Sequence, residues 1–111
     1  MHDVTTHGDL PAGLTLARTT DEFTDGTVPA GLLRAHRVAD GVWGRLVVRG
    51  GSVGFVFEDA PDVLLTLSAG DAVVIPPGRL HHVRPGAGCR FVVEFHRAAS
   101  DSRSHENPGG D

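Results

Sequence analysis

The sequence lacks several features that would assign a compartment or a macromolecular partner. It has one cysteine, Cys89, so no disulfide can form within the chain, and we expect a reducing compartment, the cytoplasm. It has no lysine, and its ten arginines stand against 14 acidic residues, for a formal net charge of −4. A nucleic-acid partner is not expected, because a basic stripe is missing. A membrane partner is not expected either, since no stretch approaches the ~20 apolar residues of a spanning helix.

The sequence does contain short apolar runs separated by 15 glycines and seven prolines. These runs are LLRAHRV at 32–38, WGRLVVR at 43–49, SVGFVFE at 52–58, VLLTL at 63–67, DAVVI at 71–75 and RFVVEFH at 90–96. Short runs rich in Val, Leu, Ile and Phe between turn residues predict β-strands, and Gly50-Gly51 predicts a hairpin turn between two of them. No segment has a helical apolar period, so the predicted fold class is all-β, a sandwich or barrel.

The length of 111 residues fits a single domain. We expect residues 1–12 to be a flexible N-terminus and residues 98–111, AASDSRSHENPGGD, to be a disordered tail, because the tail lacks apolar anchors. Residues 13–97 then form the barrel. A core of this size is modest, so we expect it to be supplemented by a homodimer, for example through pairing of edge strands.

One stretch, GDAVVIPPGRLH, has a definite spacing of turn residues ahead of a histidine. Gly70 turns the chain into a strand, and the prolines at 76–77 end its ladder because they lack an N–H. Gly78 then allows a tight return that brings His81 to the start of the next strand. The adjacent His82 should face the other way, since neighbours on a strand point to opposite faces. The spacing resembles the second motif of the cupin superfamily, small jelly-roll barrels that commonly hold a metal ion in the barrel mouth.

The first cupin motif, which normally supplies two histidines and a glutamate ahead of a glycine, is depleted in this chain. If Gly50 ends the motif, His36 takes the place of the first histidine. Val38 and Trp43 then stand where the second histidine and the glutamate are expected. The resemblance therefore implies two histidine ligands, His36 and His81.

The chain also resembles a narrower group, the small cupins related to YeaR and to the N-terminal domain of the tellurite-resistance protein TehB. The resembling stretches are LPAGL at 10–14, VPAGLLRAH at 28–36, WGRLVV at 43–48, FVFED at 55–59, VVIPPGRLHHV at 73–83 and RFVVEF at 90–95. In that group a histidine follows VPxGLL, so the depleted first motif is normal for it. The resemblance implies a metal-binding jelly-roll barrel and no particular reaction. The methyltransferase activity associated with tellurite resistance belongs to a separate domain, and no glycine-rich nucleotide-binding loop is present here.

A metal held by His36 and His81 needs a third ligand, because reactive sites usually use about three protein ligands and keep water in the open position. Glu94 is the candidate, since a carboxylate inside the apolar strand FVVEFH is costly to bury unless it is paired or metal-bound. Alternation places it on one face with Val92 and His96. Two histidines and a carboxylate suit one divalent transition metal, with zinc expected first and iron, manganese or nickel as alternatives.

Two of these three residues have structural alternatives. His81 could be a strand-start histidine that is hydrogen-bonded to a loop carbonyl. Glu94 could lie on a solvent face, paired with Arg45 or Arg49 across the strands. Both alternatives stay open at this point.

Four further residues are candidates for the pocket or its surroundings: Trp43, Arg45, His82 and His96. Trp43 could pack at the barrel end or stack on a substrate. Arg45 could form a surface salt bridge or orient an anionic ligand. His82 is expected to face outward, and His96 is expected at the rim.

The leading hypothesis is a metal-binding small cupin with one divalent metal in the barrel mouth, which binds or acts on a small molecule. The alternative is a non-catalytic, stress-related module that binds a metal, an oxyanion or a metabolite. A third hypothesis is a metal-free structural barrel that acts as a dimer. Whether the protein is an enzyme is left open.

Overall fold

The computed structural model describes residues 4–98, which form β-strands and one 3-10 turn. The elements are β1 Thr6–His7, β2 Leu14–Thr19, β3 Phe23–Thr24, η1 Ala30–Leu33, β4 Trp43–Gly50, β5 Ser52–Phe57, β6 Leu65–Ser68, β7 Ala72–Ile75, β8 His81–Pro85 and β9 Arg90–Ala98. The predicted all-β class is confirmed. Within these residues, no helix has the length and apolar character needed to cross a membrane.

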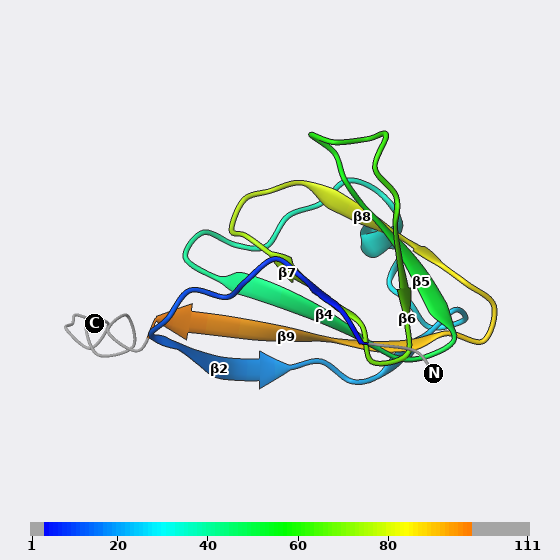
Figure 1. The fold of residues 1–111 in the computed structure, drawn as a ribbon, viewed down its shortest axis with the longest axis horizontal. Coiled ribbons are helices and arrows are strands. Elements are labelled where there is room, and N and C mark those ends of the chain that lie inside the picture. Colours follow the sequence, from blue (N-terminus) through cyan, green and yellow to red (C-terminus); the bar gives the residue numbers. More distant parts are fainter. Residues whose placement is uncertain (1–3, 99–111) are drawn as a thin grey trace.

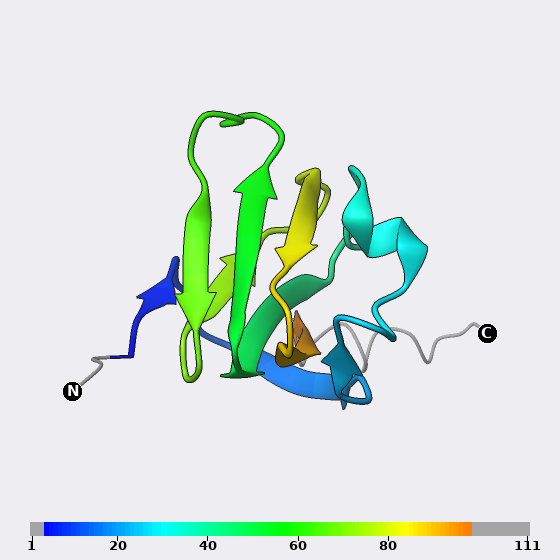
Figure 2. The same ribbon diagram turned by 90° about the vertical axis from the view of Figure 1, so that its right-hand side faces the viewer.

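The strands form two sheets that face each other, in the manner of a small jelly roll (Figures 1 and 2). The larger sheet has the order β1-β7-β4-β9-β2, with β3 also pairing with β9, and the smaller sheet has the order β6-β5-β8. Only β1 and β7 run parallel among the described strand pairs. In Figure 2 the smaller sheet stands upright beside η1, with β4 and β2 below it.

The core lies between the two sheets and follows from alternation along the strands. Leu46 and Val48 of β4 are each 1% exposed, and they meet Phe91 and Val93 of β9 in the same apolar cluster. Phe55 of β5 reaches this cluster from the smaller sheet. The polar residues Arg45, Glu94 and His96 therefore lie on the outer face of the larger sheet.

The Gly50-Gly51 pair does not make the predicted hairpin. β4 pairs with β7 and β9, whereas β5 pairs with β6 and β8, so the chain crosses here from one sheet to the other. Gly51 has φ +63°, and a Cβ built there would lie 2.9 Å from the Cα of Cys89. Glycine is required because the backbone of Gly51 has a left-handed conformation and runs against the turn before β9.

The predicted strand at 32–38 is also wrong. Its first residues belong to η1, where the Leu32 N–H donates to the Pro29 carbonyl at 2.9 Å. Only His36 pairs with a strand, through an isolated bridge to His81. Leu32 packs against the core cluster from this turn, so the apolar composition of the segment reflects a cover over the core instead of a strand.

Two residues of the segment 1–12, which we expected to be flexible, pair with β7 as the short strand β1. The Thr5 N–H donates to one carboxylate oxygen of Asp71 at 2.8 Å, and the Ser68 N–H donates to the other at 2.9 Å. Asp71 thus closes the turn before β7 and anchors the start of the chain. Residues 1–3, and all of the predicted tail 98–111 except Ala98, lie outside the described residues.

Candidate functional site

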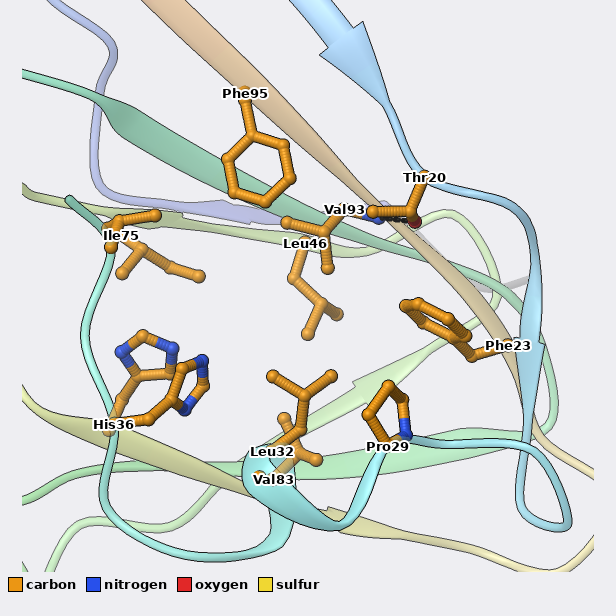
Figure 3. Close-up of a pocket in the computed structure, with 13 residues that line it drawn as sticks. Thr20, Phe23, Pro29, Leu32, His36, Leu46, Ile75, Val83, Val93 and Phe95 are labelled. Atoms are coloured by element: carbon orange, nitrogen blue, oxygen red, sulfur yellow. Dashed lines mark hydrogen bonds between the residues drawn. The ribbon is translucent and has the colours of Figure 1, made fainter.

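A cavity of about 270 Å³ lies between the two sheets (Figure 3). Its walls are mostly apolar, with Phe95 and Leu32 on opposite sides and Leu46 between them. The polar side chains in the wall are His36, His81 and Thr20. An apolar cavity with a few polar groups is the usual form of a small-molecule site.

His36 and His81 meet in the cavity wall through both backbone and side chain. The His36 N–H donates to the His81 carbonyl at 2.9 Å, and the His81 N–H donates to the His36 carbonyl at 2.8 Å. Their rings meet edge to face, with centroids 4.1 Å apart and an interplanar angle of 61°. The His81 ring also stacks on Phe55, with centroids 5.2 Å apart. The structure therefore brings together the two histidines that the motifs predicted.

His81 is 3% exposed, and this burial lowers its pKa to about 4, although the hydrogen bond to the Arg79 backbone acts in the opposite direction. Its Nδ1 lies 3.0 Å from the Arg79 carbonyl, which can only accept, so Nδ1 carries the proton and Nε2 carries the lone pair. The loop-carbonyl alternative for His81 is thus correct as a contact. It leaves the second ring nitrogen available to a ligand.

Burial also favours the neutral form of His36. Burial lowers the pKa of His36, although the backbone of His81 and Arg34 acts against this. Its Nδ1 is buried and has no hydrogen-bond partner among the described residues. Buried polar atoms are normally paired, so this unpaired ring nitrogen is an exception among the residues of the cavity wall.

The pair of neutral imidazoles fits part of a metal site. Neutral imidazole nitrogens are ligands for zinc, iron and nickel. Nevertheless, no group of three or more His, Cys, Asp or Glu side chains in residues 4–98 is arranged to hold a metal ion. The cavity thus offers two protein ligands, and the remaining positions would fall to a bound molecule or water.

Glu94 is not brought to these histidines. It lies opposite Arg45 in the β4–β9 pairing, and Nη1 of Arg45 donates to its two carboxylate oxygens at 3.3 and 3.4 Å. His96 Nε2 lies 3.0 Å from the same carboxylate. Glu94 therefore lies on the outer face of the sheet, which was the structural alternative to a metal ligand. Arg45 forms the salt bridge that was one of its two expected roles. Pairing with Arg45 and His96 accounts for a carboxylate in this apolar strand.

The other candidates also lie outside the cavity wall. His82 faces away from the cavity as predicted, with Nδ1 paired to the Glu58 carboxylate and Nε2 accepting from Arg84 at 3.3 Å. Trp43 lies opposite His96 in the β4–β9 register, on the outer face of the larger sheet. Neither residue is placed to stack on a molecule in the cavity.

The sequence argument missed Thr20, Leu32 and Phe95 as cavity residues. Leu32 stands in the VPAGLLRAH stretch four residues before His36, so that motif carried a signal for it. Thr20 had no such signal. Its hydroxyl accepts from the Val93 N–H at 3.0 Å, a contact that only the folded pairing of the segment after β2 with β9 creates.

Comparisons with known proteins agree with this architecture. A protein from E. coli (strain K12) has 26% identity over 81% of this chain and 96% of its own, with a TM-score of 0.73. TehB from Haemophilus influenzae has a TM-score of 0.75 at 17% identity, covering 86% of this chain. A cupin-2 domain containing protein from Shewanella frigidimarina aligns less well, with 22% identity, a TM-score of 0.47 and coverage of 78% and 72% of the two chains. No curated protein matches the chain.

This chain corresponds to 36% of the length of the TehB chain, so the activity of the whole TehB protein does not transfer to it. The TehB-like domain itself matches residues 18–93, which include both cavity histidines and every strand from β3 to β8. The chain therefore belongs to the family of TehB-like domains.

Proposed function

We propose that this TehB-like domain binds a small, largely apolar molecule in the cavity between its sheets, and that the His36–His81 pair recognises the molecule's polar group. The observation that supports this is the meeting of His36 and His81 in a mostly apolar wall, where Nδ1 of His36 is buried and has no partner among the described residues. A hydroxyl or amide on the ligand would satisfy that nitrogen and the free Nε2 of His81. Among the described residues that line the cavity there is no carboxylate or thiol, so we favour binding over catalysis.

The first test compares phenol with toluene, which matches its shape without the hydroxyl group. We expect phenol to shift the imidazole NMR signals of His36 and His81, and to bind about tenfold more tightly than toluene because of one added hydrogen bond. His36→Phe should remove the preference for phenol. Glu94→Gln is the matched control on the outer face and should leave both affinities unchanged. If neither compound shifts the two histidine signals in folded protein, the proposal fails.

A divalent metal ion is the second candidate occupant, favoured by two neutral imidazoles whose centroids are 4.1 Å apart. We propose zinc first, with iron, manganese or nickel as alternatives, bound by His36 and His81. A bound metal would supply Lewis-acid chemistry to a molecule in the cavity. Titration with zinc or nickel alone should shift both imidazole signals, and His36→Ala and His81→Ala should each abolish the effect. His96→Ala is the control, and an equal loss in that variant would assign the metal to the outer face.

The homodimer and the cytoplasmic location stay predictions. Light scattering of the purified chain would give the mass in solution. A monomer across the micromolar range would remove the third hypothesis, a dimeric structural barrel.

A further inference from the structure

A second hollow, of about 380 Å³, adjoins the first. Val38 and Phe95 line both spaces, so the hollow lies next to the cavity at the end of β9. Its apolar lining is completed by Ala17, Ala39 and Val42. Unlike the first cavity, it is lined by two charged side chains, Arg18 and Arg97.

The strand pairing explains why both arginines reach this hollow. Arg18 of β2 lies opposite Phe95 of β9, after a register shift between Leu16 and Arg18, and residues opposite one another in a sheet share a face. Arg97 follows Phe95 by two positions on the same strand, so it shares that face as well. The Arg18 guanidinium carbon lies 4.9 Å from the centroid of the Phe95 ring, a cation–π contact that holds the group over the hollow.

These two arginines differ from four others in the chain. Arg45, Arg49, Arg79 and Arg90 each contact a carboxylate. Among residues 4–98, by contrast, no ion pair joins Arg18 or Arg97 to an acidic side chain, including Asp40, which follows the lining residue Ala39. Two unpaired positive charges therefore border one apolar hollow.

We infer that this hollow binds a small amphipathic anion, with a carboxylate or phosphate group held between Arg18 and Arg97. The guanidinium group presents its donors as a planar fork, which suits both kinds of oxyanion. The apolar part of the molecule packs on Val38, Val42 and Phe95. This site uses different polar groups from the His36–His81 pair, so it does not depend on the function proposed above.

The experiment uses the full chain at low ionic strength with hexanoate, its neutral counterpart hexanamide, and hexyl phosphate. We expect hexanoate or hexyl phosphate to shift the arginine Nε–Hε NMR signals of Arg18 and Arg97 and to bind at least tenfold more tightly than hexanamide. Arg18→Gln and Arg97→Gln should each weaken anion binding about tenfold and leave hexanamide unchanged. Arg84→Gln, on the outer face of β8, is the matched control and should bind like the wild type. Which of the two anions binds more tightly distinguishes a carboxylate site from a phosphate site.

Arg18→Lys keeps the positive charge but loses the planar set of guanidinium donors, so its affinity for the anions should be intermediate. This variant separates hydrogen bonding by the guanidinium group from attraction by charge alone. Raising the salt concentration should weaken the binding of hexanoate and hexyl phosphate and leave the binding of hexanamide unchanged. The inference is overturned if hexanoate and hexyl phosphate bind no better than hexanamide, if the two glutamine variants bind like the wild type, or if the anions shift only the His36 and His81 signals. The last result would leave the cavity proposal standing while removing this one.

Discussion

The backbones of His36 and His81 hydrogen-bond to each other in both directions while their rings meet edge to face in the cavity wall. The same backbone pairing that closes the fold thus sets the spacing of the two imidazoles. It also buries His81 and partly buries His36, and this burial lowers the pKa of both imidazoles. The two histidines therefore contribute to the stability of the domain, and they also form its candidate site.

We predict that the domain loses stability as the pH falls from neutral toward 4. The pKa of His81 is lowered by burial to about 4, against an ordinary value of 6.5. The unfolded chain therefore takes up a proton between these values that the folded chain does not bind, so the free energy of unfolding decreases on acidification through this window. For a pKa shift from 6.5 to about 4 the loss is on the order of 3 kcal/mol and is complete below pH 4. Urea unfolding at several pH values between 4 and 7.5 measures it.

The variant His81→Phe should flatten this pH dependence relative to the wild type. His96→Gln is the control, since His96 lies on the outer face beside Glu94. Acidic residues also titrate near pH 4, so the difference between the wild type and each variant is the quantity to compare. An equally steep loss of stability in His81→Phe would contradict the assignment.

Replacing Glu94 by glutamine should lower the free energy of unfolding by about 1 kcal/mol, because its carboxylate contacts both Arg45 and His96 in a partly buried position. Binding in the cavity should be unchanged. Glu22→Gln removes a carboxylate that pairs with the more exposed Arg49 and Arg90, and it should cost less. A loss of metal or phenol binding in Glu94→Gln would return Glu94 to the site.

Leu46→Ala should destabilise the domain by roughly 2–5 kcal/mol, since it removes buried methyl groups and enlarges the cavity that Leu46 lines. Val63→Ala provides the contrast, because Val63 is 53% exposed and its truncation should stay within about 0.5 kcal/mol. Thermal unfolding gives both values. A small loss for Leu46→Ala would mean that the sheets close over the vacated space.

Gly51→Ala and Gly13→Ala separate two costs of replacing a glycine. Both residues have positive φ, +63° and +86°, but only at Gly51 would the new Cβ meet backbone, the Cys89 Cα at 2.9 Å. Gly13→Ala should therefore cost about 1 kcal/mol from backbone conformation alone. Gly51→Ala should cost clearly more, because the backbone of the turn before β9 must move. Equal decreases in the free energy of unfolding, measured with denaturant, would show that the turn before β9 can move at little cost.

Much of the fold follows from local patterns in the sequence. Apolar runs between turn residues indicated β4, β5, β7 and β9, and alternation separated Phe91 and Val93 from Glu94 along one strand. The turn spacing ahead of His81 indicated that this histidine faces inward and that His82 faces outward. These predictions succeed because strand alternation and turn chemistry are local properties.

The failures all concern relations between strands that are distant in sequence. A Gly-Gly pair joins strands equally well within one sheet or between two, so Gly50-Gly51 could not reveal the crossing. Glu94 looked like a ligand because the partner that explains it, Arg45, is set by the β4–β9 register. In the same way, the segment at 32–38 has the composition of a strand, but Leu32 covers the cavity from the turn η1.

The reciprocal hydrogen bonds of His36 also tie the cavity wall to β8. The segment around His36 is held to β8 by those two bonds, and the Val38 carbonyl accepts from the Gly78 N–H at 3.2 Å. Any movement that lifts this segment breaks these bonds and separates the two imidazoles. Amide hydrogen exchange at His36 and His81 therefore measures how often this part of the cavity wall opens.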